Sequence, residues 1–385
     1  MLLKNGRILR SDYRFFTGDM RVEDDRIVQI GVLEPQPGET VHQLEGKLVL
    51  PGLIETHFHG AMGLDSTLGE ERAFAAFSSF MAAHGITSFV PALISSPDAV
   101  TERYLAAGRA YMDHPAPGAQ MVGMYLEGPF ISPEHKGAHD PAVLQLPDLA
   151  KVQRWQQLAG GRIRKLLVAP ELPGAEPVIR WAAGQGIVTE IGHSGASYEQ
   201  AKAAIEWGAT LATHVFNAMS PLHHRQPGIL AAVLLDDRVT CELIADLGHV
   251  AQPVVELVYR LKGENHIDLI SDAFSAAGLP EGTYIHTDGR PIIVKDGLAR
   301  LEDGTLMGST STILDGMRNL VRRCGVPLES AVRTVTANPA RTLGLHDRGC
   351  LAPGKRADLA VLDEQLTVCA TYVGGREVYR RPENA

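Results

Sequence analysis

The sequence predicts an α/β fold: a (β/α)8 TIM barrel with a small β-sandwich domain formed from both termini. Through the middle of the 385-residue chain, short apolar runs alternate with Ala-rich segments of helical length, the pattern of parallel strands covered by helices. Both ends of the chain are instead rich in short β-type segments separated by turn residues. Polar residues follow the apolar runs, at the strand ends where barrel enzymes carry their active sites.

The two ends are expected to pair into one β-sandwich. At the start, strands are predicted over residues 2–9, 20–30 and 47–50, and at the end over 356–362 and 368–378. The predicted division is therefore residues 1–52 and 345–385 for the sandwich and 53–344 for the barrel.

Eight barrel strands are predicted in chain order. They cover residues 53–56, 88–92, 121–126, 165–169, 187–191, 210–213, 240–245 and 267–271. Crossover helices are expected over 71–83, 99–112 and 198–207, a hairpin insertion over 283–306, and closing helices over 310–324 and 328–336.

Composition excludes several classes of protein. Lys and Arg number 36 against 45 Asp and Glu, a formal charge of −9, and no basic stripe offers the footprint of a nucleic-acid binder. No apolar run approaches the ~18 residues of a membrane span, and the first residues lack the pattern of a secretory signal. Four widely spaced cysteines indicate reduced thiols. We therefore expect a cytoplasmic protein with no nucleic-acid or membrane partner.

Metal-ligating residues follow several of the predicted strands. His57 and His59 lie at i and i+2 on one face of the first strand, so both can reach one cation. Glu127, His193, His214 and Asp272 end four other strands. Carboxylate and imidazole groups with an open coordination position are typical of a hydrolytic metal site, in which the ion lowers the pKa of bound water and polarises a carbonyl.

The chain resembles the amidohydrolase superfamily through Pro51 to Gly60 and through Gly354 to Leu362. Within it, the chain resembles the N-acetylglucosamine-6-phosphate deacetylase family. The segments that carry this resemblance are Leu126 to Phe130, Lys136 to His139, Gly192 to Ser194, Thr213 to Met219, Ser271 to Ala273 and Ala337 to Ala340.

The resemblance implies a divalent metal, zinc or iron, held by Glu127, His193 and His214, with Asp272 as the catalytic base and then acid. Many other amidohydrolases bridge two metals with a carboxylated lysine on strand four, but here Glu127 takes that place. His57 and His59 are kept, so either one or two ions per subunit remain open.

The same resemblance implies an amino-sugar phosphate as the small-molecule substrate. Asn217, Ala218, His249 and Arg225 are expected on its phosphate side, with Arg225 in its own subunit or lent by the neighbour in a homodimer. Ala138, His139, Leu306, Met307 and Gly308 are expected at the sugar and the acetamide carbonyl.

Two departures from the family pattern concern the substrate. The usual Asp-Gly-x-His is here Asp246-Leu247-Gly248-His249, which we expect to disturb the backbone beside the phosphate. The usual Leu-Ala-Gly-Ser is here Leu306-Met307-Gly308-Ser309, which we expect to enlarge a pocket wall.

The expected reaction is hydrolysis of N-acetylglucosamine 6-phosphate to glucosamine 6-phosphate and acetate. Two alternatives stay open. Another amidohydrolase, acting on an N-acyl amino acid or a different amino-sugar phosphate, would keep the metal site but use Arg225 and His249 differently. A catalytically silent barrel that serves as a binding protein would be expected to lose ligands, and the expected ligands are all present in the sequence.

Overall fold

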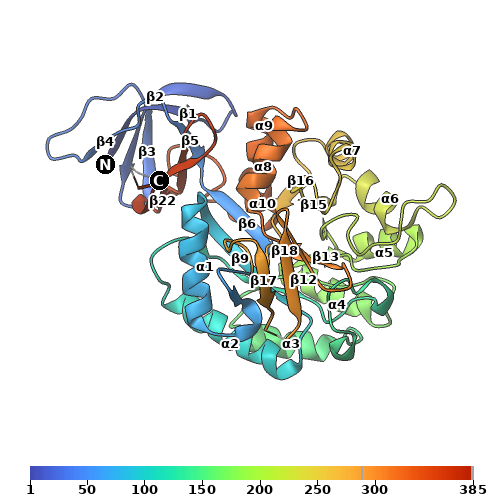
Figure 1. Cartoon of the computed structure of the whole chain (residues 1–385). Helices are drawn as coiled ribbons and strands as arrows, with labels where there is room; N and C mark the ends of the chain where they lie inside the picture. The colour runs from blue at the N-terminus through green and yellow to red at the C-terminus, as the bar shows by residue number, and fades with distance from the viewer. Residues whose placement is uncertain (288, 383–385) are drawn as a thin grey trace.

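A computed structural model describes residues 1–287 and 289–382. Eight parallel strands form the barrel, each hydrogen-bonded to the next one along the chain, and helices surround them (Figure 1). The strands are β6 (Leu53–Phe58), β9 (Ile86–Ile94), β11 (Met124–Glu127), β12 (Ile163–Leu167), β13 (Val188–Ile191), β14 (Leu211–Ala212), β15 (Thr240–Ile244) and β16 (Ile267–Ile270). A short strand, β10 (Gln120–Met121), also pairs with β9. The predicted barrel is therefore confirmed.

Helices on the outside connect and cover these strands. They are α1 (Glu71–Ala83), α2 (Asp98–Asp113), α3 (Leu149–Leu158), α4 (Ala175–Gly184), α5 (Tyr198–Trp207), α6 (Gly228–Leu235), α7 (Gln252–Lys262) and α8 (Ile313–Arg322). Helix α5 shows how the sequence sets such bounds. Ser197 and Gln200 form a reciprocal capping box at its start, and Gly208, with φ 116°, ends it.

The barrel is nearly closed between its first and last strands. In the described ranges β6 and β16 share no strand ladder, and the link between α9 (Leu328–Arg333) and α10 (Ala337–Thr342) fills the gap. The Val335 carbonyl accepts from the Ile54 N–H at 2.9 Å, and the Thr334 carbonyl accepts from the Leu269 N–H at 2.9 Å. Nearer the strand ends, the Asp272 N–H donates to the His57 carbonyl at 3.0 Å.

Both termini contribute to one eight-stranded sheet beside the barrel (Figure 1). Its strands are β1 (Leu2–Leu9), β2 (Phe15–Glu23), β3 (Arg26–Gly31), β4 (Val41–Gln43), β5 (Leu48–Pro51), β21 (Leu359–Leu362), β22 (Val368–Val373) and β23 (Arg376–Arg380). Strands β5 and β21 pair antiparallel. Buried residues of both ends, including Leu3, Val22, Leu359 and Tyr372, share one apolar cluster, so the sheet curls around a common core.

The insertion expected as a hairpin is a four-stranded antiparallel sheet. It contains β17 (Gly282–Ile285), β18 (Pro291–Lys295), β19 (Leu298–Arg300) and β20 (Leu306–Ser309). Phe274, Ile292, Val294 and Met307 form its apolar core. The Ser309 N–H donates to the Asp272 carbonyl at 2.8 Å, which fastens this sheet to the end of the last barrel strand.

Smaller elements complete the barrel loops. They are the two-stranded ribbon β7 (Gly60–Ala61) and β8 (Leu64–Asp65), and the 3-10 turns η1 (Ser66–Leu68), η2 (Pro133–His135) and η3 (Pro141–Val143). Among the described residues, none of the helices combines the length and the apolar character needed to cross a bilayer.

Candidate metal centre and active site

Glu127, the last residue of β11, lies at the centre of a buried cluster of imidazoles. Its Oε1 is 3.3 Å from His193 Nε2 and 3.0 Å from His214 Nε2. Its Oε2 is 3.0 Å from His59 Nε2 and 3.6 Å from His139 Nε2. His57 Nε2 lies 3.5 Å from Oε1. Oε1 therefore faces His57, His193 and His214, and Oε2 faces His59 and His139.

The hydrogen bonds of His193 fit a cation in this cluster. Its Nδ1 donates to the His135 carbonyl at 2.8 Å, and burial lowers the pKa of His193, so the ring is neutral and presents a lone pair at Nε2. That lone pair faces the ionised Glu127, whose pKa is held well below its ordinary value by His57 and His59 despite burial. Two acceptors at 3.3 Å repel each other unless a positive ion lies between them.

A second observation supports this fit. His57 Nε2 is buried and has no hydrogen-bond partner in the described part of the chain, and an orphaned buried imidazole nitrogen is costly unless a ligand satisfies it. His57, His59 and Asp272 offer ligand atoms close enough to share one ion, and His193 and His214 lie 3.3 Å and 3.0 Å from Glu127 Oε1. The residues present therefore suit one or two divalent cations.

Unusual backbone conformations hold the strand-end ligands. His193, His214 and Asp272 all have positive φ, at 44°, 21° and 49°, a region that costs a non-glycine residue about 1–2 kcal/mol. Backbone hydrogen bonds retain these turns: the Ser132 N–H donates to the His193 carbonyl at 2.9 Å, and the Ser309 N–H to the Asp272 carbonyl at 2.8 Å. Such strain is typical of functional sites.

His139 is a neutral hydrogen-bond donor at the edge of this cluster. The Ser95 N–H donates to His139 Nδ1 at 3.2 Å, and Ser95 Oγ lies 2.7 Å from the same nitrogen. The ring proton therefore resides on Nε2, which faces Glu127. Burial lowers the pKa of His139 to about 4, so this residue can donate a proton in a hydrogen bond without carrying a charge.

Asp272 is ionised and lies beside His57 and His59. Its Oδ1 is 3.2 Å from His59 Nε2 and 3.6 Å from His57 Nε2. Burial alone would raise its pKa, but the hydrogen bond from His59 and the neighbouring imidazole charge lower the pKa to about 2. At neutral pH the carboxylate can therefore accept a proton.

A cavity of about 190 Å³ opens over these groups. Besides the cluster, it is lined by Ala138, Asn217, Ala218, His249, Leu306, Met307 and Gly308. Met307 is fully buried within the core of the inserted sheet. The volume that methionine adds relative to the alanine of the family pattern therefore packs into that core. Gly308 has φ 68°, and a Cβ there would lie 2.6 Å from the Asp272 carbonyl oxygen.

Arg225, expected at the phosphate from the sequence, lies away from the lining of this cavity. It lies in an exposed loop, and its Nη1 is 2.7 Å from His224 Nε2. Among the described residues of this chain, Arg225 is not part of the cavity lining.

Hydrogen bonds from Asp246 hold the Asp246–His249 turn. Leu247 takes the left-handed conformation, with φ 66°, that glycine would adopt more easily. Asp246 Oδ1 accepts from the N–H groups of Gly248 and His249 at 2.9 Å each, and Asp246 Oδ2 lies 2.7 Å from His249 Nδ1. The carboxylate thereby turns His249 Nε2, which has no partner within the described ranges, towards the cavity.

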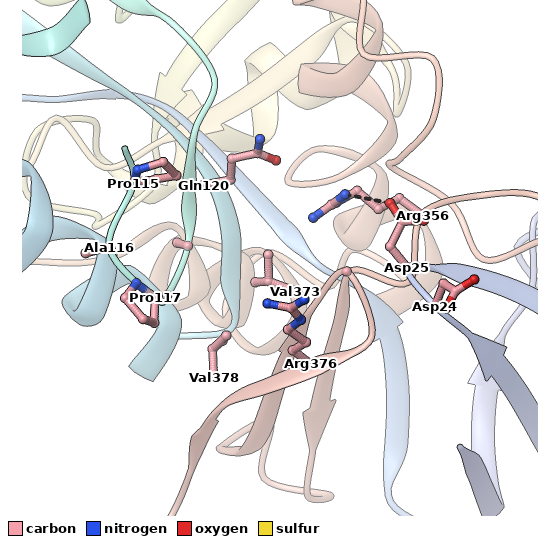
Figure 2. A pocket seen from close by; sticks show the side chains of 13 residues that line it. Asp24, Asp25, Pro115, Ala116, Pro117, Gln120, Arg356, Val373, Arg376 and Val378 are labelled. Carbon is pink, nitrogen blue, oxygen red and sulfur yellow. Dashed lines mark hydrogen bonds and ion pairs between the residues drawn. The ribbon is translucent and has the colours of Figure 1, made fainter. Parts of the chain in front are cut away.

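A larger cavity of about 770 Å³ lies elsewhere, between the terminal sheet and residues 115–120 (Figure 2). Its charged residues include Arg356, which pairs with Asp25 at 2.9 Å and with Asp358 at 3.1 Å. None of the candidate metal ligands lines it among the described residues. This cavity lies where the terminal sheet meets the barrel. The candidate metal ligands instead surround the smaller cavity.

Sequence reasoning missed the polar residues inside the barrel. Lys165, Glu190 and Glu242 occur within β12, β13 and β15, and all three are fully buried. Their signal was a charged residue within each short strand that the parallel barrel should bury on both faces. Ser95, which orients His139, carried no comparable signal.

Known proteins resemble this chain over nearly its whole length. The Amidohydrolase family model matches residues 48–378. A Lysinibacillus sphaericus protein named N-acetylglucosamine-6-phosphate deacetylase is 32% identical, with 98% of this chain and 97% of that protein covered. An Escherichia coli O157:H7 protein named N-acetylgalactosamine-6-phosphate deacetylase is 33% identical, with 97% and 98% covered. The structure of a mutant N-acetyl-D-glucosamine-6-phosphate deacetylase from Mycobacterium smegmatis, in complex with N-acetyl-D-glucosamine-6-phosphate, has a TM-score of 0.91 at 34% identity and covers 98% of this chain and 99% of its own.

Proposed function

This chain belongs to the amidohydrolase family, and from that membership we propose that it hydrolyses N-acetyl-D-glucosamine 6-phosphate to D-glucosamine 6-phosphate and acetate. The observation that carries the proposal is the arrangement around Glu127: imidazoles face both of its oxygens, and an ionised Asp272 lies beside them under one cavity. The names of the relatives support the substrate. The product would enter amino-sugar recycling in the cytoplasm.

Glu127, His193 and His214 would hold the primary ion, zinc or iron, and His57 and His59 would hold a second one. A divalent cation at this position supplies Lewis-acid polarisation of a carbonyl oxygen and makes water a stronger acid.

The residues of the chain supply the proton transfers. Asp272, ionised and 3.2 Å from His59, accepts the proton of the attacking water and then returns it to the departing amine nitrogen. His139, with its proton on Nε2, donates a hydrogen bond to the acetamide oxygen as negative charge develops there.

We propose that the phosphate lies beside Asn217, Ala218 and His249, with Ala138, Leu306, Met307 and Gly308 around the sugar. Arg225 would come from the neighbouring subunit of a homodimer, since in its own chain it lies in an exposed loop away from the cavity lining. If so, mixing Arg225→Ala and Asp272→Asn proteins should restore activity, because one site of each hybrid dimer keeps both residues. Failure of the mixture to regain activity after proven subunit exchange would assign Arg225 to its own subunit.

We also propose that the barrel spans residues 53–344, with residues 1–52 and 345–385 forming the other domain. The β5–β21 ladder, which joins the two ends of the chain, supports this division.

The substrate proposal is tested by acetate release. N-acetylglucosamine 6-phosphate, N-acetylgalactosamine 6-phosphate and unphosphorylated N-acetylglucosamine are offered to metal-loaded protein at equal concentrations. We expect the highest kcat/KM with the first. A preference for the second would favour the alternative that the Escherichia coli relative represents, since the two sugars differ only in the orientation of one hydroxyl. Equal rates with unphosphorylated N-acetylglucosamine would show that the protein does not recognise the phosphate.

A further inference from the structure

A buried ion network lies inside the barrel beneath the candidate metal centre. Lys165 Nζ is 2.6 Å from Glu190 Oε1, also pairs with Glu242 Oε1, and donates to the Thr56 carbonyl at 3.0 Å. The three charged side chains are fully buried. Buried charges are expensive unless they are paired and hydrogen-bonded, and the proposed chemistry does not use these residues directly.

The network reaches the metal centre at His57. Glu242 Oε2 lies 2.9 Å from His57 Nδ1 and accepts from Thr213 Oγ1 at 3.2 Å. The other oxygen of this carboxylate pairs with the Lys165 ammonium, so Glu242 is an ionised acceptor. His57 must therefore donate from Nδ1, and its Nε2 is directed towards Glu127 and Asp272, at 3.5 Å and 3.6 Å.

The network is not a separate cation site. His57, Glu190 and Glu242 could share an ion by distance alone, but the Lys165 ammonium already contacts both carboxylates. The lysine is therefore the cation that compensates their charge.

We propose that Glu242 is a positioning residue for His57, and Lys165 for Glu242, and that this pair sets the affinity of the second cation. A carboxylate behind a metal-ligating histidine fixes its tautomer and ring orientation and makes it a better ligand. Glu190 pairs with Lys165 and accepts from Tyr125, but no hydrogen bond or ion pair joins it to His57 among the described residues. The proposal rests on the proposed metal-dependent function, yet it concerns metal binding alone.

Glu242→Gln and Glu190→Gln make a matched pair of variants. Each keeps the shape of a buried side chain and leaves Lys165 one carboxylate, but only Glu242→Gln replaces the carboxylate behind His57 with a neutral amide. Metal-free protein is dialysed against a series of free Zn²⁺ concentrations, and bound zinc is measured by atomic emission. Thermal unfolding of the metal-free proteins reports whether each variant is folded.

We expect wild type to bind two ions. Glu242→Gln should weaken the second ion about 10–100-fold, the usual effect of losing such a partner, with the first ion within threefold of wild type. Glu190→Gln should bind both ions as wild type does. Zinc isotherms of Glu242→Gln that match wild type, or equal losses in both variants, would overturn the proposal.

If Glu242→Gln does not fold, the triple variant Lys165→Met, Glu190→Gln, Glu242→Gln removes all three charges of the buried network, which is better tolerated than leaving one of them uncompensated. It should show the same selective loss of the second ion, and unchanged isotherms would again overturn the proposal. Because the readout is bound zinc, failure here is distinct from failure of the proposed reaction, which would appear as absence of acetate release by wild type.

Discussion

The proton-transfer role that we propose for Asp272 leads to a quantitative prediction for Asp272→Asn. The change removes the acceptor of the proton but preserves the shape of the side chain. Asn tolerates the left-handed conformation of residue 272, with φ 49°. The backbone bonds to His57 and Ser309, at 3.0 Å and 2.8 Å, are unaffected. Fold and primary metal should therefore be retained.

The expected loss is a factor of about 10²–10⁴ in kcat, the range for general acid–base catalysis. At about 1.36 kcal/mol for each factor of ten, this corresponds to about 2.7–5.4 kcal/mol of transition-state stabilisation. The assay is steady-state acetate release, together with metal content and thermal unfolding. Asp268→Asn is a matched control, because Asp268 is a buried carboxylate of β16, the strand that Asp272 follows, and accepts from Thr342 at 2.7 Å. Its kcat should stay within about threefold of wild type.

Turnover of Asp272→Asn within threefold of wild type would refute the assignment of the base. Loss of the primary metal in this variant would instead make Asp272 a ligand whose main role is to retain the ion.

Other perturbations test different parts of the site. Arg225→Ala should cost about 1.5–3 kcal/mol in kcat/KM for the phosphorylated sugar, with little change for the unphosphorylated one. An equal loss with both sugars would show that Arg225 does not bind the phosphate. Glu127→Ala should abolish metal retention and activity, whereas the double variant His57→Asn, His59→Asn should lose at most the second ion. Metal-to-protein ratios measure both effects. Loss of all metal in the double variant, with metal retained in Glu127→Ala, would contradict the two-site assignment. Burial would raise the pKa of Asp246, but its hydrogen bonds lower that pKa in the folded state. Its ionised form therefore stabilises the fold above the unfolded value of ~3.9, and this contribution is lost as pH falls through the lower folded pKa. Asp246→Asn should consequently flatten the decline in the free energy of unfolding below about pH 4, measured by urea titration, and an unchanged slope would exclude this linkage.

The barrel was predictable because its signals are local. Each strand is a short apolar run, and parallel strands in a barrel bring the residues after them to one mouth. Glu127, His193 and His214 come from three separate segments, yet their placement at strand ends was enough to predict that they meet.

The inserted sheet and the buried network show where this reasoning stops. Asp296-Gly297 between β18 and β19 is a hairpin signal, but the pairing of β17 and β20 around it depends on how the insertion packs on the barrel. Lys165, Glu190 and Glu242 come together only through the stagger of neighbouring strands, which sets which inward-facing residues share a layer. The periodicity of a single strand does not contain that information.

The joining of both chain ends in one sheet has a consequence for biosynthesis. Strand β5 ends at Pro51 and pairs with β21, which begins at Leu359. One edge of β5 pairs with β1 early, but the other edge stays unpaired until the ribosome has made residues 359–362. Contacts so distant in sequence form late and slowly. During translation, the barrel strands can assemble in order while β5 keeps an unpaired edge, the kind of surface that chaperones protect from aggregation.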